Sequence, residues 1–197
     1  RNALVRSAHS ILEEEGVDKL SLRAVARKTG VSQTAPYRHF ADKSALLAAV
    51  AAEGFTALAN EMTSWAGPHD QPRDQLHAMG RAYVSFALRR PNQFRLMFGP
   101  DAPAMRSQAE FVEAGSHAYQ VISDTVARCQ EGQSAGEDAA VARRFATIAA
   151  WAFVHGLSTL MVDGLVGAGE EEGIDLEMLV DRVLSVVSIS PEAGPSV

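Results

Sequence analysis

A run of polar side chains between residues 32 and 43 has the chemistry needed to contact DNA. Short hydroxyl and amide groups, which can hydrogen-bond base edges or phosphates, precede a phenol, an imidazole and two cations that can reach the DNA backbone. With a serine and an arginine from the preceding segment, the candidates for DNA contact are Ser21, Arg23, Ser32, Gln33, Thr34, Tyr37, Arg38, His39 and Lys43. Similar clusters also occur on ordinary solvated surfaces, so the assignment to DNA contact depends on the helices that carry these side chains.

Two short helices around a glycine turn are predicted to position these side chains. Ser21 suits a helix N-cap, and Leu22, Val25 and Ala26 have the spacing of one buried helical face. Gly30 allows the turn through positive φ, Val31 is expected to fill the angle between the helices, and Ser32 to cap the second helix. The pattern predicts a helix-turn-helix, whose second helix can enter the DNA major groove.

A third helix is predicted to start directly after this motif. Asp42 is expected to cap it, so that its unpaired N–H groups and positive dipole end face the same region as Lys43. Pro36 is unusual inside a helix, but in the first turn its missing N–H costs little.

The uneven charge distribution is compatible with DNA binding despite a net charge of −6. Residues 1–50 hold eight Lys/Arg against five Asp/Glu, whereas residues 51–197 hold ten against nineteen. Basic groups therefore concentrate at the end that would contact DNA, and the rest of the chain is expected to stay off the duplex.

No catalytic, metal-binding or cofactor-binding pattern is recognisable. Metal-ligand spacing, a phosphate-binding glycine loop and a nucleophile elbow are not found. Cys129 is the single cysteine, so an intrachain disulfide is excluded. Its apolar surroundings favour an inert thiol over a redox sensor. No segment is judged long and apolar enough to span a membrane, because the run 146–154 ends at His155. A cytoplasmic, non-enzymatic protein is expected.

The remaining chain is predicted to be entirely α-helical. Breakers and apolar periodicity separate helices over residues 2–16, 42–65, 72–90, 91–98, 104–131, 137–166 and 175–187. The predicted domains are a helix-turn-helix domain (1–47), a ligand-binding and dimerisation domain (48–190) and a tail (191–197). Since helix 42–65 belongs to both domains, it is a plausible lever between them.

Trp151 and His155, four residues apart, share one helical face, and Gly156 allows close backbone approach. Core packing, with one internal hydrogen bond to His155, is one interpretation. The other is a ligand cavity with one polar anchor in apolar walls. Candidate walls, each of which could equally be core, are Tyr83, Phe86, Phe94, Met97, Phe98, Phe111, Trp151 and His155.

The segment 21–43 resembles the N-terminal domain of the TetR family of transcriptional repressors, where a closing Y-x-H-F beside a lysine-bearing helix is distinctive. Tyr37, His39, Phe40 and Lys43 match that pattern. W-x-x-x-H-G, with F-R-L-M-F-G upstream, is similar to the C-terminal domain of the TetR subgroup named for its Trp-His-Gly motif. The resemblance implies that these three residues are a structural signature, and Pro36 departs from many relatives.

The resulting hypothesis is a homodimeric DNA-binding regulator, released from a palindromic operator by a small molecule. The helices at 137–166 and 175–187 would meet their copies in a four-helix bundle, although they could also complete a monomeric core. A helical adaptor protein with a vestigial DNA-binding head is the alternative, and an α-helical enzyme lacks any supporting constellation.

Overall fold

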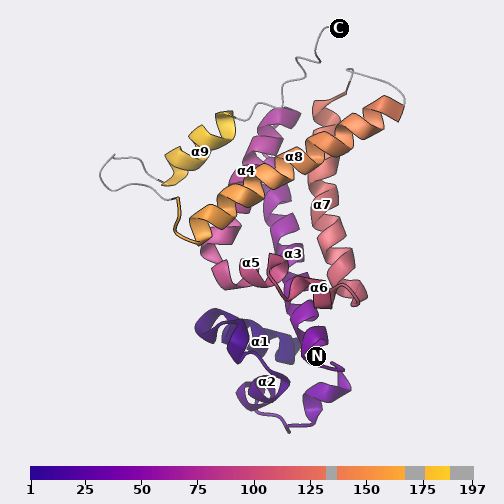
Figure 1. Ribbon diagram of the computed structural model, residues 1–197, viewed down its shortest axis with the longest axis vertical. Coiled ribbons are helices and arrows are strands. Elements are labelled where there is room, and N and C mark those ends of the chain that lie inside the picture. Colours follow the sequence, from indigo (N-terminus) through magenta and orange to yellow (C-terminus); the bar gives the residue numbers. More distant parts are fainter. Residues whose placement is uncertain (132–136, 167–175, 187–197) are drawn as a thin grey trace. The chain divides into compact units, whose positions relative to one another are not determined.

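The computed structural model describes residues 1–131, 137–166 and 176–186, and every regular element in these ranges is helical (Figure 1). This confirms the predicted all-α class. Most of the loops predicted at 131–136 and 168–173, and the whole predicted tail, lie outside the described residues. The chain forms two compact units. Unit 1 comprises Arg1–Glu61 and Phe86–Gln120, and unit 2 comprises Met62–Ser85 and Val121–Val197.

Unit 1 begins with a helical head whose first helix provides its core. Helix α1 (Asn2–Glu15) is followed by the short 3₁₀ helix η1 (Val17–Lys19), α2 (Leu22–Thr29) and the 3₁₀ helix η2 (Ala35–Arg38). Gly16 ends α1 with φ +83°, a conformation that favours glycine. The apolar positions at helical spacing are buried as predicted: Leu4, Val5, Ala8, Ile11 and Leu12.

Five further helices follow, and three of them contribute residues to both units. These three are α3 (Lys43–Ala66), α4 (Pro72–Arg89) and α7 (Ala109–Cys129). The shorter α5 (Pro91–Phe98) and α6 (Ala102–Met105) belong to unit 1. The predicted domain boundary at residue 47 stays a prediction. The two compact units do not separate there, because unit 1 includes residues on both sides of residue 47.

Within unit 1, α5 packs against α3 at a glycine. A Cβ atom on Gly54 would lie 2.5 Å from Gln93 Nε2 and 2.7 Å from Met97 Sδ, so no larger residue fits without a shift. The buried Gln93 amide donates to the Val50 carbonyl at 2.9 Å. Gly54 therefore allows the close approach of α3 and α5, and the hydrogen bond of Gln93 fixes the register of α5 against α3.

The helix predicted over 104–131 is in fact two helices, α6 and α7. The chain turns at residues 106–108, where Gln108 N–H donates to the Met105 carbonyl at 2.9 Å. The Ser107 hydroxyl donates to the Ala104 carbonyl at 3.3 Å, a local bond that competes with helix continuation. Sequence periodicity missed this break because apolar residues continue on both sides of it.

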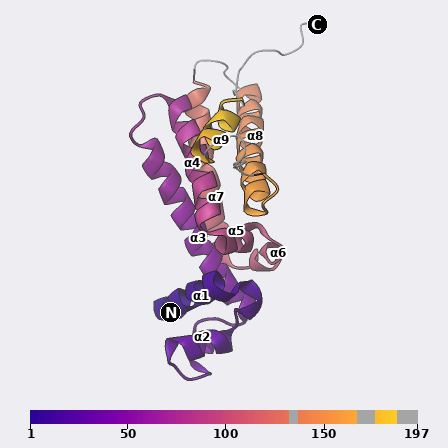
Figure 2. The same cartoon turned by 90° about the vertical axis from the view of Figure 1, so that its left-hand side faces the viewer.

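Unit 2 contains α8 (Glu137–Val162) and α9 (Leu176–Val186). Figure 2 shows α9 beside α4, in agreement with the Leu184 side chain lying against Gly80. By length and composition, residues 139–162 of α8 would suffice to cross a membrane, contrary to the prediction that no segment would. Helices of soluble proteins also meet this criterion, so the finding is weak evidence for a membrane span.

Candidate nucleic-acid interface and ligand cavity

The first helix of the predicted motif forms as expected from its local chemistry. Ser21 caps α2 by accepting a hydrogen bond from the Ala24 N–H at 3.1 Å. Gly30 ends the helix in the left-handed region, at φ +74° and ψ +29°. The next N–H, of Val31, donates back to the Ala26 carbonyl at 3.0 Å. These bonds satisfy backbone groups that would otherwise be unpaired at the helix ends.

The second element is shorter than predicted. Instead of an α-helix capped by Ser32, the chain makes a turn and then the 3₁₀ helix η2 at Ala35–Arg38. Pro36 supplies the reason, since it has no N–H to donate to residue 32 and its ring disfavours the preceding turn of an α-helix. Val31 was predicted to fill the angle between helices, but its side chain is 40% exposed.

Eight of the nine predicted DNA-contact residues are exposed to solvent. Tyr37 is 53% exposed, and Phe40, which is only 2% exposed, anchors the segment in the core. Ser21 is half-buried by its capping role, while the exposed members are Arg23, Ser32, Gln33, Thr34, Tyr37, Arg38, His39 and Lys43. Unit 1 thus presents hydroxyl, amide, imidazole and cationic groups from α2, the turn, η2 and the start of α3.

The start of α3 is capped as predicted. Asp42 Oδ1 accepts from the Ala45 N–H at 2.8 Å. The Lys43 ammonium lies 3.5 Å from the Val17 carbonyl oxygen of η1, a long contact that leaves the exposed cation able to reach a phosphate. DNA contact by these residues remains a prediction.

Five of the eight side chains predicted to line a ligand cavity belong to unit 1. The Phe55 ring makes edge-on contacts with Phe98 and Phe111, at centroid distances of 5.2 and 5.5 Å, and Phe94 lies 5.2 Å from Phe98. Phe86 and Met97 are also buried in this unit. These side chains form an aromatic and aliphatic core, which is favourable without any ligand.

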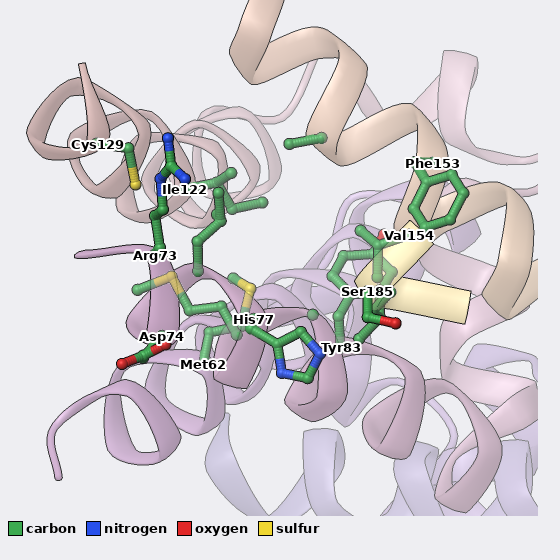
Figure 3. Close-up of a pocket in the computed structure, with 15 residues that line it drawn as sticks. Met62, Arg73, Asp74, His77, Tyr83, Ile122, Cys129, Phe153, Val154 and Ser185 are labelled. Atoms are coloured by element: carbon green, nitrogen blue, oxygen red, sulfur yellow. The ribbon is translucent and has the colours of Figure 1, made fainter. Parts of the chain in front are cut away.

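A cavity of about 270 Å³ lies wholly within unit 2, and Tyr83 is the one predicted wall that lines it. Its surface is mainly apolar and comes from α3, α4, α7, α8 and α9 (Figure 3). The apolar lining includes Met62, Leu76, Met79, Gly80, Ile122, Ala150, Phe153, Val154 and Leu184. An apolar hollow with few polar groups is the form that small-molecule sites usually take.

Trp151 and His155 instead bind the hydroxyl of Tyr83. The hydroxyl lies 3.0 Å from His155 Nδ1, and Trp151 Nε1 donates to it at 3.3 Å. Burial raises the pKa of Tyr83 and lowers the pKa of His155, so both side chains stay neutral near pH 7. The network joins α8 to α4 next to the cavity. Trp151 and His155 are not among the residues that line the cavity, so their arrangement agrees with the packing interpretation and not with cavity lining.

Sequence reasoning missed the polar residues that line the cavity. They are Arg73, Asp74 and His77 on α4, Cys129 on α7 and Ser185 on α9. In Figure 3, Arg73 and Cys129 lie together at one end of the cavity, here called the lip, and Ser185 lies near Tyr83 at the other. A usable signal existed on α4, because residues 73, 77 and 80 follow helical spacing toward Tyr83. Among residues that the structure describes, no three His, Cys, Asp or Glu side chains are placed to hold a metal ion.

Family models match both parts of the chain. Residues 4–50 match the model of bacterial regulatory proteins of the tetR family, and residues 76–187 match a tetracyclin repressor-like C-terminal domain. The second match alone covers more than half of the 197 residues.

Curated relatives agree over part of their length. The tetracycline repressor protein class A from transposon 1721 of Escherichia coli is 35% identical over 128 residues, which are 62% of this chain and 58% of the relative. The class C tetracycline repressor of Escherichia coli is 38% identical over 74 residues, 38% of this chain and 30% of the relative. The chain thus matches less than two thirds of either relative.

Solved structures share the fold over nearly the whole chain. A protein of unknown function from Rhodococcus sp. RHA1 is 32% identical, with a TM-score of 0.71 over 94% of this chain and 89% of that one. The regulator FadR from Bacillus subtilis, in complex with stearoyl-CoA, has a TM-score of 0.69 at 15% identity and covers 94% and 96%. At that identity the likeness establishes the fold alone.

Proposed function

We propose that this chain, which belongs to the TetR family of DNA-binding transcriptional regulators, is a homodimeric repressor that a small molecule releases from a palindromic operator. The family is one of regulators and not of enzymes. The observation that carries the proposal is the exposed polar surface of unit 1, formed by α2, the turn, η2 and the start of α3. Ser21 and Gly30 fix the two ends of α2, and Asp42 caps α3.

The proposed DNA contacts divide into two kinds. Gln33 and Thr34, on the exposed turn before η2, are proposed to read base edges in the major groove. The exposed Tyr37, Arg38 and Lys43 are proposed to hold phosphates and so to fix the register of the head on the duplex.

Dimerisation is supported by the apolar surface of α8. Val141, Phe145 and Ile148 follow one another at helical spacing and are 54%, 68% and 43% exposed. Large apolar side chains gathered on one face are unusual on a monomer and typical of an interface. We propose that this face meets a second copy, together with α9, as predicted for residues 137–166 and 175–187; residues 167–175 and 187 lie outside the described chain.

Release by a small molecule is supported by the unit 2 cavity. A ligand that binds the DNA-incompetent state more tightly would lower operator affinity by about 5–150-fold, which corresponds to ~1–3 kcal/mol of coupling. Helices α3, α4 and α7 each have residues in both units, so a change around the cavity has continuous helices through which to act.

Two finer assignments follow. The Trp151, His155 and Gly156 arrangement supports membership of the subgroup named for its Trp-His-Gly motif, with the Tyr83 hydroxyl as the partner of the first two residues. The proposed place of action is the cytoplasm, where a DNA-binding regulator meets its operator.

The alternative function is a helical adaptor with a vestigial DNA-binding head, because the exposed apolar face of α8 would also suit a protein partner. The substitutions Lys43→Ala and Tyr37→Ala distinguish the regulator from this adaptor. In a fluorescence titration against mixed-sequence duplex DNA, the regulator loses affinity with each change. Arg106→Ala, an exposed cation between α6 and α7, is the matched control and leaves affinity unchanged. Wild-type protein without measurable DNA affinity would support the adaptor.

A further inference from the structure

The lip of the unit 2 cavity carries the exposed positive charge of Arg73. Arg73 projects from α4 toward Cys129 on α7 in Figure 3, and both line the cavity. Within the described part of the chain, Arg73 has no hydrogen-bond or ion-pair partner. Burial raises the pKa of the Cys129 thiol, and the charges of Arg73 and Arg128 oppose that rise, so both guanidinium groups lie near the same sulfur atom.

The second guanidinium at this lip is held only by neutral groups. Arg128 donates to Gln75 Oε1 at 2.8 Å and to Thr125 Oγ1 at 2.9 Å. Neither acceptor carries a charge, so these bonds orient the guanidinium without cancelling its positive field. Arg73 therefore lines one end of a mainly apolar cavity, and the charge of Arg128 acts on the same lining thiol from outside the lining.

The one carboxylate among the lining residues does not neutralise them. Asp74 lies in the first turn of α4, where a negative charge is favoured by the positive end of the helix dipole. In Figure 3 its carboxylate points away from Arg73 and from the cavity interior. His77, which also lines the cavity, can add a hydrogen-bond donor.

The volume of the cavity limits the size of an apolar group. Met62, Met79, Tyr83, Ile122 and Val154 are among the side chains that line it. A cavity of 150 Å³ can hold benzene, so by proportion about 270 Å³ accommodates an apolar body of about ten non-hydrogen atoms.

We propose that the effector is a compact amphiphilic organic anion, whose carboxylate binds Arg73 at the lip and whose apolar body fills the space next to Tyr83. This inference rests on the proposed ligand-released function and names the chemical class of that ligand. Arginine is suited to the task because its planar guanidinium can pair with a carboxylate through two parallel hydrogen bonds.

Calorimetric titration of the full chain, without DNA, tests the class with matched probes. Octanoate and 4-phenylbutyrate represent the anions, 1-octanol and 4-phenyl-1-butanol the neutral bodies, and octylamine the opposite charge. At least one anion is expected to bind about tenfold or more tightly than its alcohol. Arg73→Gln should remove that preference and leave alcohol binding unchanged, whereas Arg106→Gln, an equal loss of charge in unit 1, should preserve it.

Three results would overturn the proposal: equal affinity for anion and alcohol, tightest binding of octylamine, or no binding of either anion. Failure of the proposed function is distinguishable, because operator binding is measured separately. An anion that binds through Arg73 but leaves DNA affinity unchanged would preserve the ligand class and contradict ligand-released repression.

Discussion

The Tyr83 hydroxyl lies 3.0 Å from His155 Nδ1 and also accepts a hydrogen bond from Trp151 Nε1. Tyr83 itself is only 1% exposed. One buried hydroxyl on α4 thus satisfies two polar groups on α8, beside the cavity that Tyr83 lines.

Tyr83→Phe is expected to destabilise the protein by about 1–3 kcal/mol, because the change leaves partly buried polar groups of Trp151 and His155 without this partner. Urea unfolding measures the loss as a lower midpoint with an unchanged slope. Tyr37→Phe makes the same substitution at an exposed site and should stay within about 0.5 kcal/mol of wild type. Equal effects at both positions would refute the structural role of the network.

Acidification is expected to weaken unit 2 through His155. Burial lowers the pKa of this residue in the folded state, so the unfolded chain takes up a proton first as pH falls. The stability associated with neutral His155 is therefore complete above its ordinary pKa of about 6.5 and is lost as pH falls toward the lowered value. The free energy of unfolding, measured between pH 7.5 and 5, should fall more steeply for wild type than for His155→Gln. Parallel curves would contradict this assignment.

Gly54→Ala is expected to destabilise unit 1 by about 1–3 kcal/mol. The added Cβ atom would lie 2.5 Å from Gln93 Nε2, and moving that amide breaks its hydrogen bond to the Val50 carbonyl. Gly115→Ala on α7 is the control, since its Cβ atom would meet Phe55 at ordinary distances of 3.6–3.8 Å. Thermal unfolding should show a lower midpoint for Gly54→Ala than for wild type. The midpoint of Gly115→Ala should not be lowered.

Phe145→Asp is expected to shift the protein from dimer to monomer, because it places a charge within the exposed apolar face of α8. Sedimentation velocity at several concentrations measures the change. Val112→Asp, at an apolar residue of α7 that is 45% exposed, should leave the dimer intact. A Phe145→Asp protein that remains dimeric would place the dimer seam elsewhere.

Local chemistry explains why parts of unit 1 could be predicted. The cap at Ser21, the turn at Gly30 and the cap at Asp42 each depend on groups within five residues of one another. The same reasoning failed at η2, where Pro36 removes a helix hydrogen bond, and at Ser107, whose side chain supports a turn. In both places one residue outweighs the surrounding periodicity.

The cavity could not be read from the sequence because core and ligand walls use the same residue types. Phe98 and Phe111 meet Phe55 in unit 1, whereas Tyr83 faces the unit 2 cavity. Only the tertiary packing separates these cases. The lip could not be predicted from the sequence either, since Arg73 and Cys129 come from different helices and form no motif along the chain.

Gln33→Ala should change which bases are preferred within each half-site while keeping binding to mixed-sequence DNA, because base contacts specify sequence and phosphate contacts hold register. Sequencing of duplexes selected by wild type and by the variant measures this. An identical preference for both proteins would show that the turn before η2 does not read bases.

The most direct test of the central claim is selection of duplexes from a random DNA library by the full-length protein. The dimeric regulator predicts a recovered palindrome whose half-site centres are about 34–36 Å apart, or a multiple of that distance. A folded, dimeric protein that enriches no sequence would contradict the regulator and favour the adaptor.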